Sequence, residues 1–174
     1  MLPDVINGLP AHVLLIHVLV ALTPLGALFT ILCAVWPAAR RKLGFVSPLT
    51  CLVALVFVPL TTHAGEWFRN RIDPQHRNSS ITKHADLGGT FVYYVLGLFI
   101  VSVAVWLLGR RFGTDASATD ATATAVRTDV RPLPQWASIT VAVVAVAVAV
   151  LAVWQCYRVG DSGAHAVWDG TLRR

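Results

Sequence analysis

Four long apolar runs constrain the fold of this 174-residue chain more than any other feature of its sequence. They cover approximately residues 11–36, 48–68, 88–108 and 136–157. Each run has the roughly 20 residues that an α-helix needs to cross the hydrocarbon core of a bilayer. Helices are expected because unpaired backbone groups are costly in lipid. The sequence therefore predicts one all-α domain over residues 1–174, an integral membrane four-helix bundle with up-down topology.

The composition indicates a membrane protein rather than a soluble or nucleic-acid-binding one. Charged residues make up 13% of the chain, about half their share in soluble domains. The net charge is +5, but the basic residues cluster beside predicted helix ends, as in Arg40-Arg41-Lys42. Basic residues at such places meet lipid headgroups. We expect the lipid bilayer, and not nucleic acid, to be the main partner of this chain.

The segments outside the apolar runs limit other interpretations. The first ten residues contain no Lys or Arg and the first run is too long for a cleaved signal peptide, so we expect a permanent helix there. Residues 113–135 are rich in Ala, Thr and Asp and are predicted to be a flexible linker. Cys33, Cys51 and Cys156 lack CxxC spacing, which argues against iron–sulfur, zinc-ribbon and c-type haem sites. Buried, small apolar roles are expected for these cysteines.

An up-down bundle would bring all of the histidines to one end. The starts of the first and third helices lie on the same side as the ends of the second and fourth. That end would hold His12, His17, His63, His76, His84 and His165, with the acids Glu66, Asp86 and Asp161. The opposite end would carry compact basic groups that have no adjacent acid, which favours the cytoplasmic side. The histidine-rich end and both termini are therefore expected outside.

Three of these histidines, His17, His63 and His84, are the predicted cofactor ligands. His17 lies more than one turn inside an apolar helix, where an ionisable side chain is costly and commonly functional. His63 and Glu66 are three residues apart and share a helical face. A structural role is the alternative for each, namely a hydrogen bond to a carbonyl, an interfacial pair or a helix start. The remaining histidines, His12, His76 and His165, are expected to be solvated or interfacial.

Three charged residues are predicted to support these ligands. A ligating histidine usually donates its other ring N–H to a carboxylate or a carbonyl. Glu66 or Asp86 could accept such a bond, and Arg69 and Asp161 are expected at the same end of the bundle. Asp86 also has a structural explanation, because an acid in the first turn of the third helix complements the helix dipole.

Prolines and small residues predict local features of the helices. Pro24 and Pro59 each remove one backbone hydrogen bond and should bend the first and second helices. Glycines 88, 89 and 97 offer a groove for a neighbouring backbone or a flat ring. Alanines 142, 145, 149 and 152 fall on one face of the fourth helix and predict a close-packing seam.

Several short patterns together resemble a known family. They are Gly8-Leu9-Pro10-Ala11-His12 with His17, His63-Ala64-Gly65-Glu66, His84-Ala85-Asp86-Leu87-Gly88 and the tail Val159–Ala164. They resemble an uncharacterised bacterial four-helix membrane protein family that starts Gly-x-Pro-x-His-Pro-x-x-x-His. The chain departs from that pattern at Val13 and at Asp161. Some members occur beside Rieske or c-type cytochrome modules, so the resemblance implies a bacterial inner (plasma) membrane and electron-transfer partners.

Three functions fit these residues. The first is a b-type haem protein with an electron-transfer role, in which two of His17, His63 and His84 bind the iron. The second is a zinc or copper site made by His17, His63, Glu66 and His84. The third is a non-enzymatic accessory subunit of a membrane complex. The chain contains no recognisable catalytic motif, and the partners left open are a redox protein, a membrane complex and a second copy of the chain.

Overall fold

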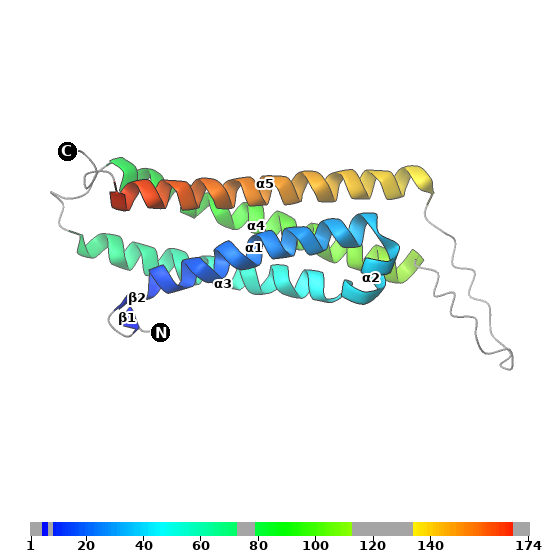
Figure 1. The fold of residues 1–174 in the computed structure, drawn as a ribbon, viewed down its shortest axis with the longest axis horizontal. Helices are drawn as coiled ribbons and strands as arrows, with labels where there is room; N and C mark the ends of the chain where they lie inside the picture. The colour runs from blue at the N-terminus through cyan, green and yellow to red at the C-terminus, as the bar shows by residue number, and fades with distance from the viewer. Residues whose placement is uncertain (1–4, 7–8, 73–78, 113–133, 169–174) are drawn as a thin grey trace, which may run out of the picture.

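The computed structural model describes residues 5–6, 9–72, 79–112 and 134–168. Four long helices dominate it (Figure 1): α1 (Ala11–Val35), α3 (Val46–Arg71), α4 (Ser79–Phe112) and α5 (Gln135–Trp168). All four are long and apolar enough to cross a membrane. The all-α four-helix bundle predicted from the apolar runs is confirmed, and the chain is a multi-pass membrane protein.

The helices alternate in direction around the bundle. Helix α1 packs against α3 and α5, and α4 packs against the same two helices. The starts of α1 and α4 therefore lie beside the ends of α3 and α5, at the left of Figure 1. We call this the histidine end, because it holds His12, His17, His63, His84 and His165. His76 lies outside the described residues.

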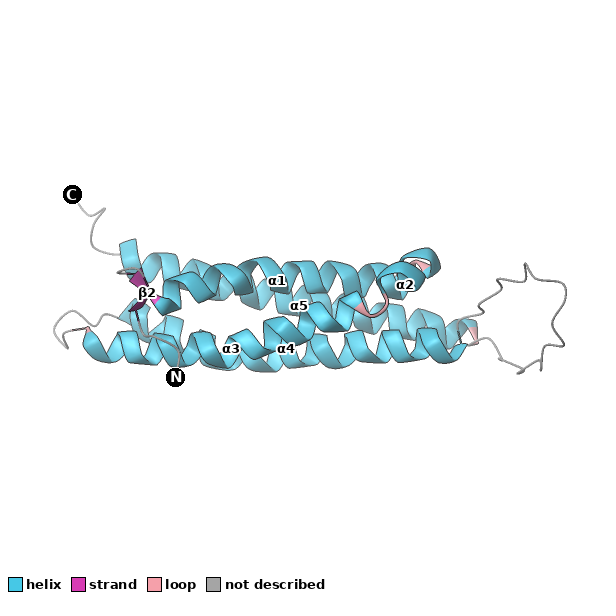
Figure 2. Ribbon diagram, turned by 90° about the horizontal axis from the view of Figure 1, so that it is seen from below, coloured by secondary structure: helices cyan, strands magenta, loops and turns pink. Residues whose placement is uncertain are grey.

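Short elements stand at both ends of the bundle (Figure 2). Before α1, β1 (Val5–Ile6) pairs with β2 (Leu9–Pro10) in an antiparallel ladder. At the opposite end, α2 (Pro37–Leu43) connects α1 to α3. The apolar runs at residues 11–36 and 48–68 left this segment outside any predicted helix. Proline at the first helical position favours a helix start, because its fixed φ suits the helix and its missing N–H is not needed.

Two helices extend well beyond their apolar runs. Helix α4 begins at Ser79 rather than near residue 88, and α5 continues to Trp168 rather than ending near residue 157. Hydropathy marks only the part of a helix that contacts lipid, whereas the backbone continues into polar sequence. The first-turn role predicted for Asp86 is therefore wrong, since Asp86 lies two turns inside α4.

Small side chains form the centre of the bundle. Ala145, Ala149 and Ala152 of α5 are fully buried, as the predicted alanine seam requires, whereas Ala142, the fourth residue of that seam, is half-buried. The three cysteines are buried and free, as expected. Many large apolar side chains point outward instead, Ile100 and Val150 among them. Such a surface suits lipid rather than water.

The prolines and glycines behave differently from one another. Pro24 and Pro59 lie inside α1 and α3, which continue past them, and the bends predicted there remain predictions. A Cβ added at Gly88 or Gly89 would meet nothing within 4 Å. Within the described part of the chain, no neighbouring backbone therefore uses the groove predicted at these two glycines.

Candidate functional site

His12 crosses from α1 to α3 at the histidine end. Its Nδ1 lies 2.9 Å from the backbone carbonyl oxygen of Thr61. The ring rests on Gly65, where an added Cβ would come within 2.8 Å of the His12 Cε1 atom. Gly65 is one helical turn beyond Thr61, so its missing side chain opens the path from the imidazole to the Thr61 carbonyl.

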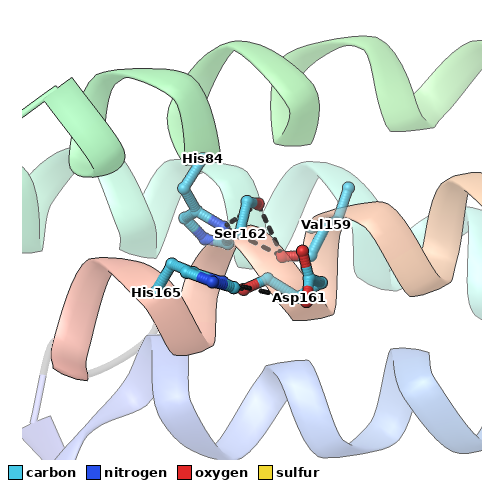
Figure 3. Close-up of polar contacts among 5 residues, drawn as sticks. All are labelled: His84, Val159, Asp161, Ser162 and His165. Carbon is cyan, nitrogen blue, oxygen red and sulfur yellow. Dashed lines mark hydrogen bonds and ion pairs between the residues drawn. The ribbon is translucent and has the colours of Figure 1, made fainter. Parts of the chain in front are cut away.

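His84 makes the same arrangement between α4 and α5. Its Nδ1 lies 3.1 Å from the carbonyl oxygen of Val159 and 3.1 Å from Ser162 Oγ (Figure 3). An added Cβ at Gly163 would come within 3.0 Å of the His84 Cε1 atom. Gly163 again stands four residues after the residue whose carbonyl is bound. We call each arrangement a histidine–glycine contact.

Both contacts fix which ring nitrogen carries the proton. A carbonyl oxygen can only accept a hydrogen bond, so Nδ1 of His12 and Nδ1 of His84 must be the donors. In the neutral imidazole the lone pair is then on Nε2. Ser162 Oγ–H donates to the Val159 carbonyl at 2.9 Å, which leaves its oxygen free to accept from His84. Each ring is thus oriented and keeps one nitrogen available as a metal ligand.

The two rings lie next to each other. The centroids of His12 and His84 are 6.1 Å apart and the ring planes are at 82°. Four helices contribute to this pair, two with a histidine and two with a carbonyl and a glycine. Both imidazoles are half-buried.

A large cavity adjoins the pair. Its volume is about 1190 Å³, and most of its lining is apolar. It contains enough room for a cofactor, since cofactor pockets usually measure about 300–1,000 Å³. The polar side chains that line it include His12, His17, His84, Glu66, Arg69 and Asp86. Gly88 and Gly89 line it as well, so the space beside them belongs to the cavity rather than to a packed helix.

The structure treats the three predicted ligands differently. His84 takes part in the central pair, and His17 lines the cavity but is exposed. The Nδ1 of His17 lies 2.6 Å from the Val13 carbonyl of its own helix, the structural bond that the sequence left as an alternative. His63 is exposed and is not one of the residues that line the cavity.

The predicted metal-ligand set is not assembled. Among the residues that the structure describes, no three His, Cys, Asp or Glu side chains lie close enough together to hold a metal ion. Glu66 lines the cavity and is exposed, and His63 lies on the same helix but outside the cavity. His17, His63, Glu66 and His84 therefore do not form one four-ligand group.

The predicted supporting residues also separate. Asp86 and Arg69 line the cavity. Asp161 does not line it, and its carboxylate lies 3.7 Å from His165 Nδ1 on the outer side of α5. Figure 3 shows this exposed pair beside the contact made by His84. Asp161 therefore has a local partner of its own.

Sequence reasoning missed most of the groups that hold the central pair. It expected His12 to be solvated or interfacial. It gave no role at the site to Thr61, Gly65, Val159, Ser162 or Gly163. Two of these act through backbone carbonyls, which no side chain reveals. The glycines were a usable signal, because a glycine near the end of an apolar helix can face a histidine on its antiparallel neighbour.

Searches of the chain against protein-family models, curated proteins and solved structures found no match. The resemblance to the bacterial four-helix family thus stays a prediction. What is established is the architecture: the chain is a four-helix membrane bundle with two neighbouring imidazoles beside a cavity at one end.

Proposed function

We propose that this bundle binds b-type haem through His12 and His84 and serves as an electron carrier. The observation that supports this most directly is the pair of oriented imidazoles, 6.1 Å apart and contacting a cavity of about 1190 Å³. Two imidazoles bound to one metal ion through nitrogens about 2 Å away would be separated by a similar distance, on the order of 6 Å.

Haem suits a site with two protein ligands. A porphyrin supplies four nitrogens of its own, so two histidines complete the iron coordination. Structural zinc needs about four protein ligands and catalytic zinc about three. No such group occurs among the described residues. The donor set therefore favours haem over the zinc or copper alternative.

The protein groups around the pair would tune bound haem, which supplies one-electron chemistry. Each Nδ1–H bond to a carbonyl orients its imidazole and increases the basicity of the ligating nitrogen. The apolar cavity lining limits access of water, a further influence on reduction potential. These contributions come from Thr61 and Val159 through their carbonyls, and from Gly65 and Gly163 through their missing side chains.

This ligand pair replaces part of the set inferred from sequence. His84 is retained, whereas His12 takes the place of His17 and His63. His17 is tied to its own helix and exposed, and His63 lies outside the cavity. Of these three histidines, His12 is the one whose ring is directed onto a neighbouring helix beside His84.

We infer an extracytoplasmic position for the histidine end, in a bacterial plasma membrane. The opposite end carries Arg40, Arg41 and Lys42 on α2 and Arg110 and Arg111 at the end of α4. Clusters of this kind anchor the cytoplasmic side. An electron donor or acceptor would then approach from outside, in agreement with the partners that the family resemblance implies.

An absorption spectrum of the detergent-purified protein tests the proposal. We expect a Soret band that is lost in His12→Ala and in His84→Ala, because each removes one of the two histidines that would hold the haem. His63→Ala and His165→Ala are the matched controls and should keep the band. A protein that lacks pigment after growth with added haem, and that fails to bind added haemin, would contradict the proposal and favour the accessory-subunit alternative. Zinc or copper found by elemental analysis without haem would favour the metal alternative.

A further inference from the structure

Arg69 is a basic residue of the cavity lining that has no part in holding the two histidines. It lies in the last turn of α3 and lines the cavity. Among the described residues that line this cavity, no other is a lysine or arginine. A guanidinium cannot lose its proton in a protein, so Arg69 is a fixed positive charge beside a largely apolar space.

The side chain of Arg69 is also incompletely bonded. Its Nε is buried and has no hydrogen-bond partner within the described part of the chain. A buried donor without a partner costs free energy, and such atoms are rare in folded proteins. The acids nearest in sequence or across the cavity, Glu66 and Asp86, are exposed and form no ion pair with it among the described residues.

The position of Arg69 relates it to the histidine pair. Thr61, Gly65 and Arg69 are spaced four residues apart on α3 and so share one face of the helix. The first two hold the His12 ring. At 1.5 Å per residue, Arg69 lies about 6 Å beyond Gly65 along the helix, toward its end. Arg69 therefore lies between the imidazole pair and the outer edge of the bundle.

We propose that Arg69 binds a carboxylate of the molecule that occupies the cavity. This inference depends on the proposed function, under which that carboxylate is a propionate of the haem. The planar guanidinium presents paired N–H groups that match a carboxylate, and bonds between charged partners are about twice as strong as neutral ones. Because the Nε is buried, the terminal N–H groups of the guanidinium would make these bonds.

Haem and its dimethyl ester distinguish this role. Both carry the same iron and ring, but the ester has no carboxylate. We expect Arg69→Gln to weaken haemin binding to the detergent-purified apoprotein roughly 10- to 100-fold. Binding of the ester should stay within about twofold of wild type. Arg69→Lys keeps the positive charge but lacks the paired N–H groups of the guanidinium. Its affinity for haemin should lie between those of wild type and Arg69→Gln.

Arg71→Gln is the matched control on the same helix. Arg71 is exposed, stacks on Trp67 with its guanidinium carbon 4.0 Å from the ring centroid, and does not line the cavity. The Arg71→Gln variant should bind haemin and its dimethyl ester with the same affinities as wild type. Helical circular dichroism identifies any variant that fails to fold, and Arg69→Lys then carries the test.

Three outcomes would overturn the inference. An Arg69→Gln protein that binds haemin as wild type does would show that Arg69 has no ligand role while the proposed function stands. Equal weakening of haemin and ester would show a structural role instead. If wild-type protein binds neither compound, the haem proposal fails together with this inference.

Discussion

Arginines and glycines have different roles at the two ends of the bundle. At the end that holds α2, Arg40 donates from Nε to the Cys33 carbonyl at 2.7 Å and from Nη2 to the Ala34 carbonyl at 2.8 Å. These carbonyls belong to the last turn of α1, where no backbone donor follows. At the histidine end, the buried Nε of Arg69 has no such partner among the described residues.

Glycines show the same contrast. Near the middle of the bundle, an added Cβ at Gly26 would lie 2.9 Å from Cys51 Sγ, so this glycine permits two helices to pack. At the histidine end, Gly65 and Gly163 permit imidazoles to reach carbonyls, beside a cavity. Close packing and satisfied polar groups indicate a scaffold. Oriented rings beside an open cavity, and a guanidinium whose Nε has no partner among the described residues, indicate a binding site.

The largest effect on stability should come from Arg40. Arg40→Met removes both bonds to the end of α1 and leaves two carbonyls without their donors. We expect a loss of about 2–3 kcal/mol in the free energy of unfolding. The measurement is an unfolding titration in mixed micelles. The exposed Arg41→Met is the control and should change little. Equal stability of the two variants would remove the contrast between the arginines.

The next effect concerns haem affinity at the histidine end. Gly65→Ala or Gly163→Ala places a methyl group against His12 or His84 and displaces the ring from its carbonyl. Overpacking of this kind costs roughly 1–3 kcal/mol, or about 5- to 150-fold in affinity. Titration of apoprotein with haemin, followed at the Soret band, measures it.

Gly97→Ala is the control for the glycine variants, because an added Cβ there would lie 3.8 Å from Val148 Cγ1, an ordinary contact. Gly97 lies on α4 and does not line the cavity. If all three variants weakened haemin binding equally, the two histidine–glycine contacts would have no special role.

A smaller effect is expected at Gln155, which joins α5 to α4. Its Nε2 donates to the Leu87 carbonyl at 3.2 Å and to Thr90 Oγ1 at 3.1 Å, and the residue is 2% exposed. Gln155→Leu keeps the volume but loses both bonds, which should cost about 1 kcal/mol. The same unfolding titration measures this loss of stability, with Gln135→Leu, at an exposed residue, as the control. A larger loss in Gln135→Leu would contradict this assignment.

The smallest effect is expected at Thr23. Its Oγ1 is buried without a hydrogen-bond partner in the described chain. It does not line the cavity, so no ligand is expected to bond it. Thr23→Val removes the unpaired hydroxyl at nearly constant volume, and stability should stay the same or rise by up to about 1 kcal/mol. A clear loss of stability would mean that this hydroxyl has a partner.

Local sequence patterns were enough for the architecture. Unpaired backbone groups are costly in lipid, so a single apolar run that is long enough can cross the membrane only as an α-helix. The alternation of four such helices then brought the histidines together without any packing information. The ends of the helices could not be predicted from hydropathy, because Ser79–Leu87 and Arg158–Trp168 are helical without being strongly apolar.

The sequence by itself determined the four-helix bundle and the end at which its polar chemistry lies. Only the tertiary structure decided which histidines meet. His17, His63 and His12 are all near that end, and hydropathy cannot tell which of them faces a neighbouring helix. That choice depends on rotation about each helix axis and on where Gly65 and Gly163 expose the Thr61 and Val159 carbonyls. Rotation is set by packing between helices, which residues distant in the chain determine together.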